Sequence, residues 1–231
     1  MNTLFYDYYN SNSPERQSEI DRCAMANFSI GFKRIIAFGN KNIDLANSSH
    51  ILKAPLNSRL TFSNFLSFVD SNQHSTGVAI LTNSDIMLDP RIIELTSDLE
   101  KNILLALSRH EADLTLVEYP WCTQDTWILK FQSIHKSAII ACQFYLGTPG
   151  CELRFAEALY ASGFTVYNPS LSIRNLHNQS ISSVHYDNDR HYGAYIFTPP
   201  CFIEQVKERD NSLSGKLCYL RKGNNLFQIH P

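Results

Sequence analysis

The chain has 231 residues, a formal net charge of −2 and 44% hydrophobic residues, which suits one large domain with a buried core. Because it has no basic block, the sequence lacks the charge pattern of a general nucleic-acid binder. No apolar stretch reaches the length of a membrane span, and the first residues lack the pattern of a signal peptide. We therefore expect a soluble, cytoplasmic protein.

Short apolar runs alternate with helical patterns along the chain, which is typical of an α/β domain. The apolar runs predict strands at 4–9, 32–39, 51–54, 77–82, 102–107, 113–119, 127–131, 165–168 and 172–176. Ser13 followed by Pro14 has the pattern of a helix start and predicts a helix to about residue 28. Further helices are predicted at 61–71, 89–95 and 150–161. Six cysteines without a CxxC spacing predict free thiols rather than a zinc site.

Two aspartates lie beside predicted strands. Asp85 follows the strand at 77–82, and ligands of open α/β sheets gather at the carboxyl ends of strands. Its carboxylate could hold Mg²⁺ or Mn²⁺ against a diphosphate, or it could simply cap the next turn. Asp125 lies between Trp121 and Trp127 in the sequence and precedes the predicted strand at 127–131. A carboxylate beside aromatic rings suits sugar recognition, although a turn aspartate between two core tryptophans is an equally good interpretation.

Three other positions are candidates for chemistry. Glu152 follows Gly150 in the first turn of a predicted helix, where it could act as a general base or only complement the helix dipole. His177 ends a strand and could bind a metal, although a lone histidine is more often structural. Arg109 could pair with a phosphate or with an internal acid. A weaker candidate, which would close over a bound donor, is the cluster of His185, Tyr186, Arg190 and Tyr192.

The order of these motifs resembles the GT-A glycosyltransferases, in particular the family 2-like bacterial and phage enzymes. Those enzymes carry a D-x-D motif at a strand end, and here Asn83-Ser84-Asp85 occupies that place, with Asn83 in place of the first acid. Gly150-Cys151-Glu152 matches their glycine-containing loop and the acid that follows it, and His177 matches a late metal ligand. The resemblance implies a GT-A-like three-layer α/β sandwich with a mostly parallel central sheet. It implies a catalytic domain over residues 1–180, with 181–231 as an extension or lid.

The implied activity is a metal-dependent, inverting transfer of a hexose or pentose from a nucleotide diphosphate sugar to an acceptor hydroxyl. Asp85 and His177 would hold Mn²⁺ or Mg²⁺. Glu152 would be the general base, with Asp125 as the next candidate. The residues expected to contact the donor or acceptor are Asn83, Arg59, Arg109, Trp127 and Gly150. The acceptor would be a surface glycan or a hydroxymethylated DNA base, and the sequence does not choose between them.

Two other functions stay open. A sugar-phosphate nucleotidyltransferase would normally have a glycine-rich loop after the first strand, but residues 10–17 contain no glycine. A non-catalytic nucleotide-sugar or carbohydrate-binding module is favoured by the missing first acid of the metal motif. The absence of GxxxxGK, GxGxxG and GxSxG patterns removes the usual support for P-loop, dinucleotide-binding and hydrolase functions.

Overall fold

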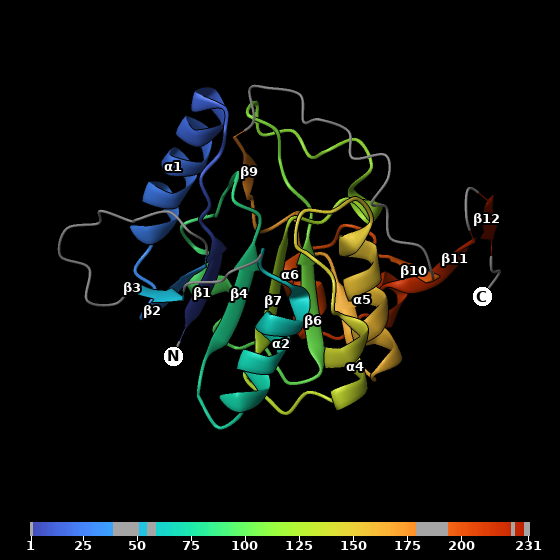
Figure 1. Ribbon diagram of the computed structural model, residues 1–231. Coiled ribbons are helices and arrows are strands. Elements are labelled where there is room, and N and C mark those ends of the chain that lie inside the picture. Colours follow the sequence, from blue (N-terminus) through green and yellow to red (C-terminus); the bar gives the residue numbers. More distant parts are fainter. Residues whose placement is uncertain (1, 39–50, 55–58, 179–193, 223–224, 229–231) are drawn as a thin grey trace.

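A seven-stranded sheet forms the centre of the computed structural model, which describes residues 2–38, 51–54, 59–178, 194–222 and 225–228 (Figure 1). In spatial order its strands are β3 (Ile51–Ala54), β2 (Arg34–Phe38), β1 (Thr3–Asp7), β4 (Val78–Thr82), β7 (Thr126–Lys130), β6 (Ile103–Leu107) and β8 (Thr165–Tyr167). Neighbouring strands run parallel, except that β7 is antiparallel to both β4 and β6. The expected α/β class with a mostly parallel sheet is therefore confirmed.

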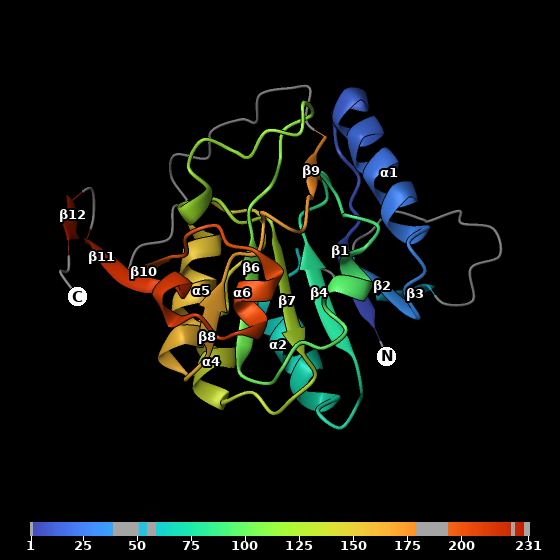
Figure 2. The ribbon, with the colours of Figure 1, turned by 180° about the vertical axis from the view of Figure 1, so that it is seen from behind.

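Helices cover both faces of this sheet, so the domain has three layers (Figures 1 and 2). One face carries α2 (Phe62–Ser71), α4 (Lys136–Ala141) and α5 (Cys151–Ala161). The other carries α1 (Pro14–Phe28), α3 (Ile92–Leu95) and α6 (Ile203–Lys207). Single turns of 3-10 helix occur at η1 (Pro120–Cys122) and η2 (Asn211–Leu213).

Alternation along the strands divides the core between the two faces. In β1, Phe5 packs in the cluster under α2 and α5, whereas Leu4 and Tyr6 pack in the cluster under α1. This is the pattern of a strand buried on both sides, because successive side chains point to opposite faces. Ring contacts strengthen the first cluster, where Phe5 meets Phe65 edge-on at 5.0 Å between ring centroids.

The helix boundaries follow from local chemistry. The Ser13 side chain accepts a hydrogen bond from the Arg16 backbone N–H, which caps α1 at its first turn. A capping box between Thr61 and Asn64 begins α2. After α5 the chain reverses at Gly163, whose φ of 91° is the left-handed conformation that favours glycine. These three predicted helices are confirmed to within a residue or two.

The predicted strand at 113–119 is wrong. Asp113 instead accepts hydrogen bonds from the backbone and hydroxyl of Thr115, which makes a tight turn, and Leu114 has a positive φ of 68°. The predicted strand at 172–176 is reduced to the two residues of β9 (Leu176–His177), which pair antiparallel with β5 (Ile86–Met87). The turn hydrogen bonds of residues 169–173 account for the rest. The sequence analysis also missed α4, α6, β5 and the three strands that follow residue 193.

Those three strands are β10 (Ala194–Phe197), β11 (Lys216–Lys222) and β12 (Asn225–Gln228), which form a separate antiparallel sheet beside α5. Ile196 belongs to the core cluster under α5, and Ile203 and Val206 of α6 belong to the other cluster. The described C-terminal residues thus pack against both faces of the domain, whereas the proposed boundary at residue 180 stays a prediction.

The remaining expectations concern helices and thiols. Among the described residues, no helix combines the length and hydropathy that crossing a bilayer requires. The five cysteines whose side chains are described carry free thiols, as their spacing predicted.

Candidate functional site

The register of the sheet brings three chain segments together at one edge. Because β7 runs antiparallel, it begins at the edge where β4 and β6 end, and Thr126 pairs with both Thr82 and Leu107. The backbone continues this pairing, since Asn83 N–H donates to the Asp125 carbonyl at 3.0 Å. Asp125 N–H donates in turn to the Leu107 carbonyl at 2.9 Å. The predicted site residues 83 and 125 are therefore neighbours.

A second strand pair brings Asp85 and His177 together. Ile86 of β5 is the register partner of His177 in β9, so Asp85 lies beside the imidazole. His177 Nε2 is 3.4 Å from Asp85 Oδ2. Arg16, in the first turn of α1, contacts the same carboxylate oxygen at 2.8 Å through Nη2. The two residues predicted to hold a metal thus meet, although they are 92 positions apart in the sequence.

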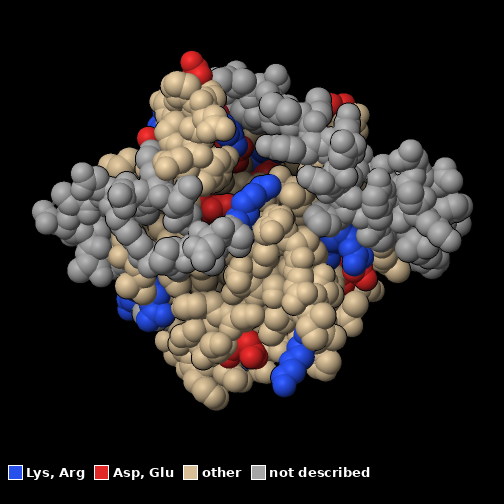
Figure 3. All heavy atoms as spheres, in the orientation of Figure 1, with Lys and Arg blue, Asp and Glu red and all other residues tan. Residues whose placement is uncertain are grey.

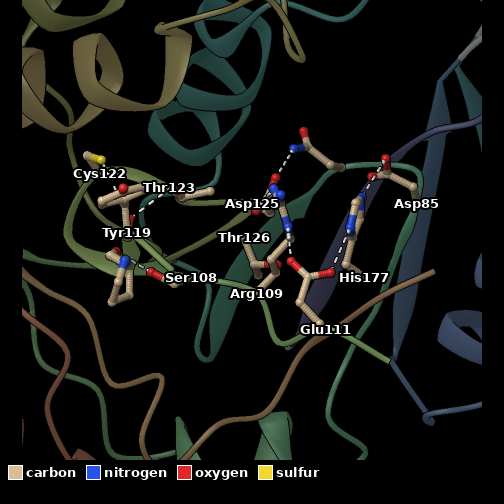
Figure 4. A network of polar contacts seen from close by, with 12 residues as sticks. Asp85, Ser108, Arg109, Glu111, Tyr119, Cys122, Thr123, Asp125, Thr126 and His177 are labelled. Atoms are coloured by element: carbon tan, nitrogen blue, oxygen red, sulfur yellow. Dashed lines mark hydrogen bonds and ion pairs between the residues drawn. The ribbon is translucent and has the colours of Figure 1, made fainter. Parts of the chain in front are cut away.

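Further ion pairs connect this group to Asp125 (Figure 4). His177 Nδ1 lies 3.6 Å from Glu111 Oε2, and Arg109 contacts Glu111 at 3.3 Å and Asp125 Oδ2 at 3.3 Å. We call the resulting series the charged chain; in order it consists of Arg16, Asp85, His177, Glu111, Arg109 and Asp125. Basic and acidic side chains alternate along it. In the space-filling view, basic and acidic atoms meet in a hollow beside α1 (Figure 3).

The charged chain shifts the pKa values of its members in directions that follow from burial and contact. Burial raises the pKa of Asp85, but the hydrogen bond with His177 and the charge of Arg16 outweigh it and hold that pKa well below its usual range. Burial lowers the pKa of His177, but contact with Asp85 outweighs it, and the net shift is upward. Burial raises the pKa of Asp125, an effect that Arg109 only partly offsets. These three groups are neighbours, yet the pKa of Asp85 is lowered whereas the pKa values of His177 and Asp125 are raised.

Asn83 has a specific structural partner. Its side-chain Nδ2 donates to Asp125 Oδ1 at 2.7 Å, whereas Oδ1 of Asn83 is buried without a hydrogen-bond partner among the described residues. A carboxylate at position 83 would face Asp125 at the same short distance, and like charges so close cannot both ionise at low cost. An asparagine at position 83 therefore avoids a like-charge contact with Asp125.

The distance between Asp85 and His177 is compatible with two ligands of one divalent cation. Two ligand atoms on one ion lie roughly 3 Å apart when each is ~2.1 Å from it, and Oδ2 and Nε2 are 3.4 Å apart. The described residues contain no group of three or more His, Cys, Asp or Glu that could hold a metal, so other ligands would have to come from a substrate or from water. Arg16 shares the Asp85 oxygen and would have to move from it or remain outside the ligand shell.

Glu152 occupies the first turn of α5, after Gly150, whose φ of 81° supports the left-handed turn that begins the helix. Only Ser162, Gly163 and Phe164 separate the end of α5 from β8. The helix therefore runs back across the sheet, and its start lies at the carboxyl edge. There burial raises the pKa of the Cys122 thiol, and the charge of Glu152 adds to this rise. Glu152 is thus placed beside the segment that precedes Asp125.

Arg59 and Asp7 form a further part of this edge. Arg59 Nη2 donates to the Leu146 carbonyl at 2.5 Å, and its guanidinium lies 5.8 Å from the centre of the Tyr145 ring. Asp7 ends β1 and is only 5% exposed. Burial raises the pKa of Asp7 to about 6, and the charge of Arg59 opposes this rise. Asp7 was missed in the sequence because the predicted strand at 4–9 placed it inside the strand, whereas β1 ends at Asp7.

The structure places Trp127 in the core and not at the site surface. It was expected to contact substrate, but its side chain is fully buried and packs edge-on against Phe62 at 4.9 Å and Phe155 at 6.0 Å between centroids. The first residues of β7 point alternately to the two faces, and position 127 faces the core under α2 and α5. The exposed aromatic side chains near Asp125 are instead Tyr119 and Trp121.

Arg109 lies in the charged chain, and Arg59 and Gly150 lie on the adjoining segments described above. The late polar cluster at positions 185, 186, 190 and 192 lies outside the described residues.

No protein-family model and no curated protein sequence matches this chain. Among solved structures, the chain is similar to HddC from Yersinia pseudotuberculosis, with 13% identity, a TM-score of 0.36, and coverage of 56% of this chain and 76% of that one. It is similar to a proposed nucleotide-diphospho-sugar transferase from Desulfovibrio desulfuricans, with 10% identity, a TM-score of 0.44, and coverage of 71% and 77%. It is also similar to GalNAc-T7, crystallised with UDP, GalNAc and Mn²⁺, with 7% identity, a TM-score of 0.47, and coverage of 80% and 45%. At TM-scores below 0.5 these similarities carry no weight for activity, which has to be inferred from the site.

Proposed function

We propose that the protein is a glycosyltransferase that moves a sugar from a nucleotide diphosphate sugar to an acceptor hydroxyl. The observation that supports this most is the charged chain at the carboxyl edge of the sheet. It lies where the strand order reverses beside β1 and β4, the place where ligands of open α/β sheets bind. Arginines there can pair with a diphosphate, and carboxylates can accept hydrogen bonds from sugar hydroxyls.

In this proposal Asp85 and His177 hold Mn²⁺ or Mg²⁺, with phosphate oxygens of the donor as further ligands. The ion would neutralise charge that develops on the leaving diphosphate. Arg16 and Arg109 flank these positions and add positive charge to the same region. His177 has to be neutral to bind a metal, so metal binding would compete with its protonation.

The remaining residues position the two substrates. Asn83 and Asp125 would bind hydroxyls of the donor, and Arg59 would lie on the side of its base. Gly150 would allow the backbone to approach the sugar closely. Glu152 would take the proton of the acceptor hydroxyl, whose oxygen forms a bond to the anomeric carbon as the bond to the diphosphate breaks. That attack from the opposite side predicts inversion of the anomeric configuration.

A thermal-shift panel of nucleotide sugars, each with and without Mn²⁺, tests the proposal. A donor should raise the melting temperature progressively with its concentration, because it binds only the folded state. Asp85→Asn should abolish the additional shift produced by Mn²⁺, whereas Asp98→Asn, at a side chain that is 77% exposed, should behave as the wild type. If no nucleotide sugar stabilises the wild type, the proposed donor class is wrong.

Glu152→Gln separates catalysis from binding. As the general base, Glu152 should contribute about 100-fold or more to the rate of transfer, whereas the donor shift should be unchanged. Activity retained in this variant would show that Glu152 is not the base and would make Asp125 the next candidate.

A non-catalytic binding module is the second candidate, and it is favoured by one contact. Arg16 already neutralises the Asp85 oxygen that a metal would use. Tight nucleotide-sugar binding with neither donor hydrolysis nor transfer in the presence of Mn²⁺ would support this second candidate.

A further inference from the structure

Two aromatic side chains are exposed at the end of the site opposite Asp85. Tyr119 is 53% exposed and Trp121 is 41% exposed, and their rings meet edge-on with centroids 5.8 Å apart. We call them the aromatic pair. In the close-up view, Tyr119, Cys122 and Thr123 lie on one side of Asp125, and Asp85 and His177 lie on the other (Figure 4).

The backbone under the aromatic pair is held by many hydrogen bonds. Pro120 lies between Tyr119 and Trp121 in the sequence. Its carbonyl oxygen accepts hydrogen bonds from the Ser108 hydroxyl and from Asn168 Nδ2, the latter at 3.1 Å. The Trp121 carbonyl accepts from the Thr198 N–H at 3.0 Å and from the side chain of Gln124 at 3.3 Å. These contacts come from the ends of β6, β8 and β10, so the rings are exposed on a fixed support.

Two carboxylates of the described residues lie close to the aromatic pair. Glu118 is the sequence neighbour of Tyr119, and burial and the charge of Glu152 both raise the pKa of the Cys122 thiol, which follows Trp121 in the sequence. The nearest arginine of the charged chain, Arg109, is already paired with Asp125 and Glu111. A polyanion such as DNA would be repelled here. A neutral sugar suits both features, because its apolar face stacks on aromatic rings and its hydroxyls donate to carboxylates.

We infer that the aromatic pair is the acceptor subsite and that the acceptor is a neutral glycan rather than modified DNA. This inference rests on the proposed function, since it assigns the second substrate of the same site. A sugar stacked on Trp121 would lie on the Glu152 side of Asp125, away from the Asp85 end where the diphosphate would bind.

Tryptophan fluorescence can test this directly. The chain has two tryptophans, of which Trp127 is buried and Trp121 is exposed, so acrylamide should quench mainly Trp121. The probes are neutral oligosaccharides of glucose, galactose, mannose and N-acetylglucosamine, added to the full chain without any donor. At least one should shift the emission saturably and protect Trp121 from quenching. A DNA duplex that carries 5-hydroxymethylcytosine should produce neither effect.

Variants show whether the aromatic pair is responsible. Tyr119→Ala keeps the reporter and should weaken sugar binding by about 3- to 10-fold, the value of one stacking contact. Tyr160→Ala, at a similarly exposed ring on α5 (43%), is the matched control and should bind as the wild type. Because Trp121→Ala removes the reporter, its binding is measured by saturation-transfer NMR and should be lost.

The outcomes are distinct from those of the donor experiment. If no oligosaccharide binds, if only the DNA binds, or if both variants of the aromatic pair bind sugar as the wild type does, the inference is overturned. Sugar binding at the aromatic pair without any nucleotide-sugar binding would instead refute the proposed donor chemistry and leave a carbohydrate-binding surface.

Discussion

Replacing Asp7 by asparagine is expected to stabilise the protein near neutral pH and to lose most of that effect in acid. The Asp7 carboxylate is 5% exposed, and none of the described residues forms a hydrogen bond or ion pair with it. Burial therefore raises its pKa from an ordinary value of 3.8 to about 6. The folded state binds the proton more tightly than the unfolded state does, so the free energy of unfolding falls as the pH rises between these two values.

The size of the effect follows from the two pKa values. Because of its raised pKa, Asp7 lowers the free energy of unfolding by roughly 3 kcal/mol at about pH 7.5 and by roughly 1 kcal/mol at about pH 4.5. Asparagine carries no charge at either pH, and any cost of its own buried amide is the same at both. The difference in stability between D7N and the wild type should therefore be about 2 kcal/mol more favourable at the higher pH.

Urea unfolding of both proteins at the two pH values measures this difference. The matched control is Asp98→Asn, because Asp98 is exposed and its ion pair with Lys207 is long, at 3.8 Å. A surface change of this kind should alter stability by less than about 0.5 kcal/mol at either pH. A D7N effect that does not change with pH would show that Asp7 is not a buried carboxylate with a raised pKa.

Three further substitutions test the site and the core. W127A should destabilise the protein by about 3–5 kcal/mol in urea unfolding, since it removes a fully buried ring; a loss below about 1 kcal/mol would contradict its placement in the core. N83D should lower stability at neutral pH, because a second carboxylate would face Asp125 at 2.7 Å, and the stability should recover in acid. Thermal melts across pH would detect this change, and a pH profile like that of the wild type would argue against the contact. H177Q should lose more stability near pH 6 than near pH 9. The raised pKa of His177 means that its contact with Asp85 stabilises the fold most below about pH 6.5, and less as the imidazole loses its proton at higher pH. Equal losses of stability at both pH values would exclude this pairing.

Periodicity predicted the elements whose apolar residues are buried in the core. The run at residues 77–82 became β4, and the pattern at 61–71 became α2, since each is apolar in a way that only one secondary structure can bury. The run at 113–119 contains Leu114, Leu116 and Val117 and looks similar, but the Asp113 side chain competes for the backbone and makes a turn. Short apolar runs beside aspartate are ambiguous for this reason.

The site could be predicted in its residue types and in its edge of the sheet, but its pairings could not. Asp85 lies beside His177 because β5 and β9 pair over two residues, and strands this short show no periodic pattern in the sequence. The role of Arg16 in contacting Asp85 was equally invisible, because it depends on where α1 crosses the end of β4. Glu111 was missed because its carboxylate matters only through contacts with Arg109 and His177.

The sequence by itself determined most strands of the central sheet, the helices α1, α2 and α5, and several of the charged residues that follow strand ends, because backbone periodicity and chain order are local properties. Tertiary structure alone decided that Trp127 is buried and Trp121 exposed, and that Asn83 contacts Asp125. Both outcomes depend on the register of β7 between β4 and β6. Register joins residues that are far apart in the chain, and a shift of one position would turn every side chain of β7 to the opposite face.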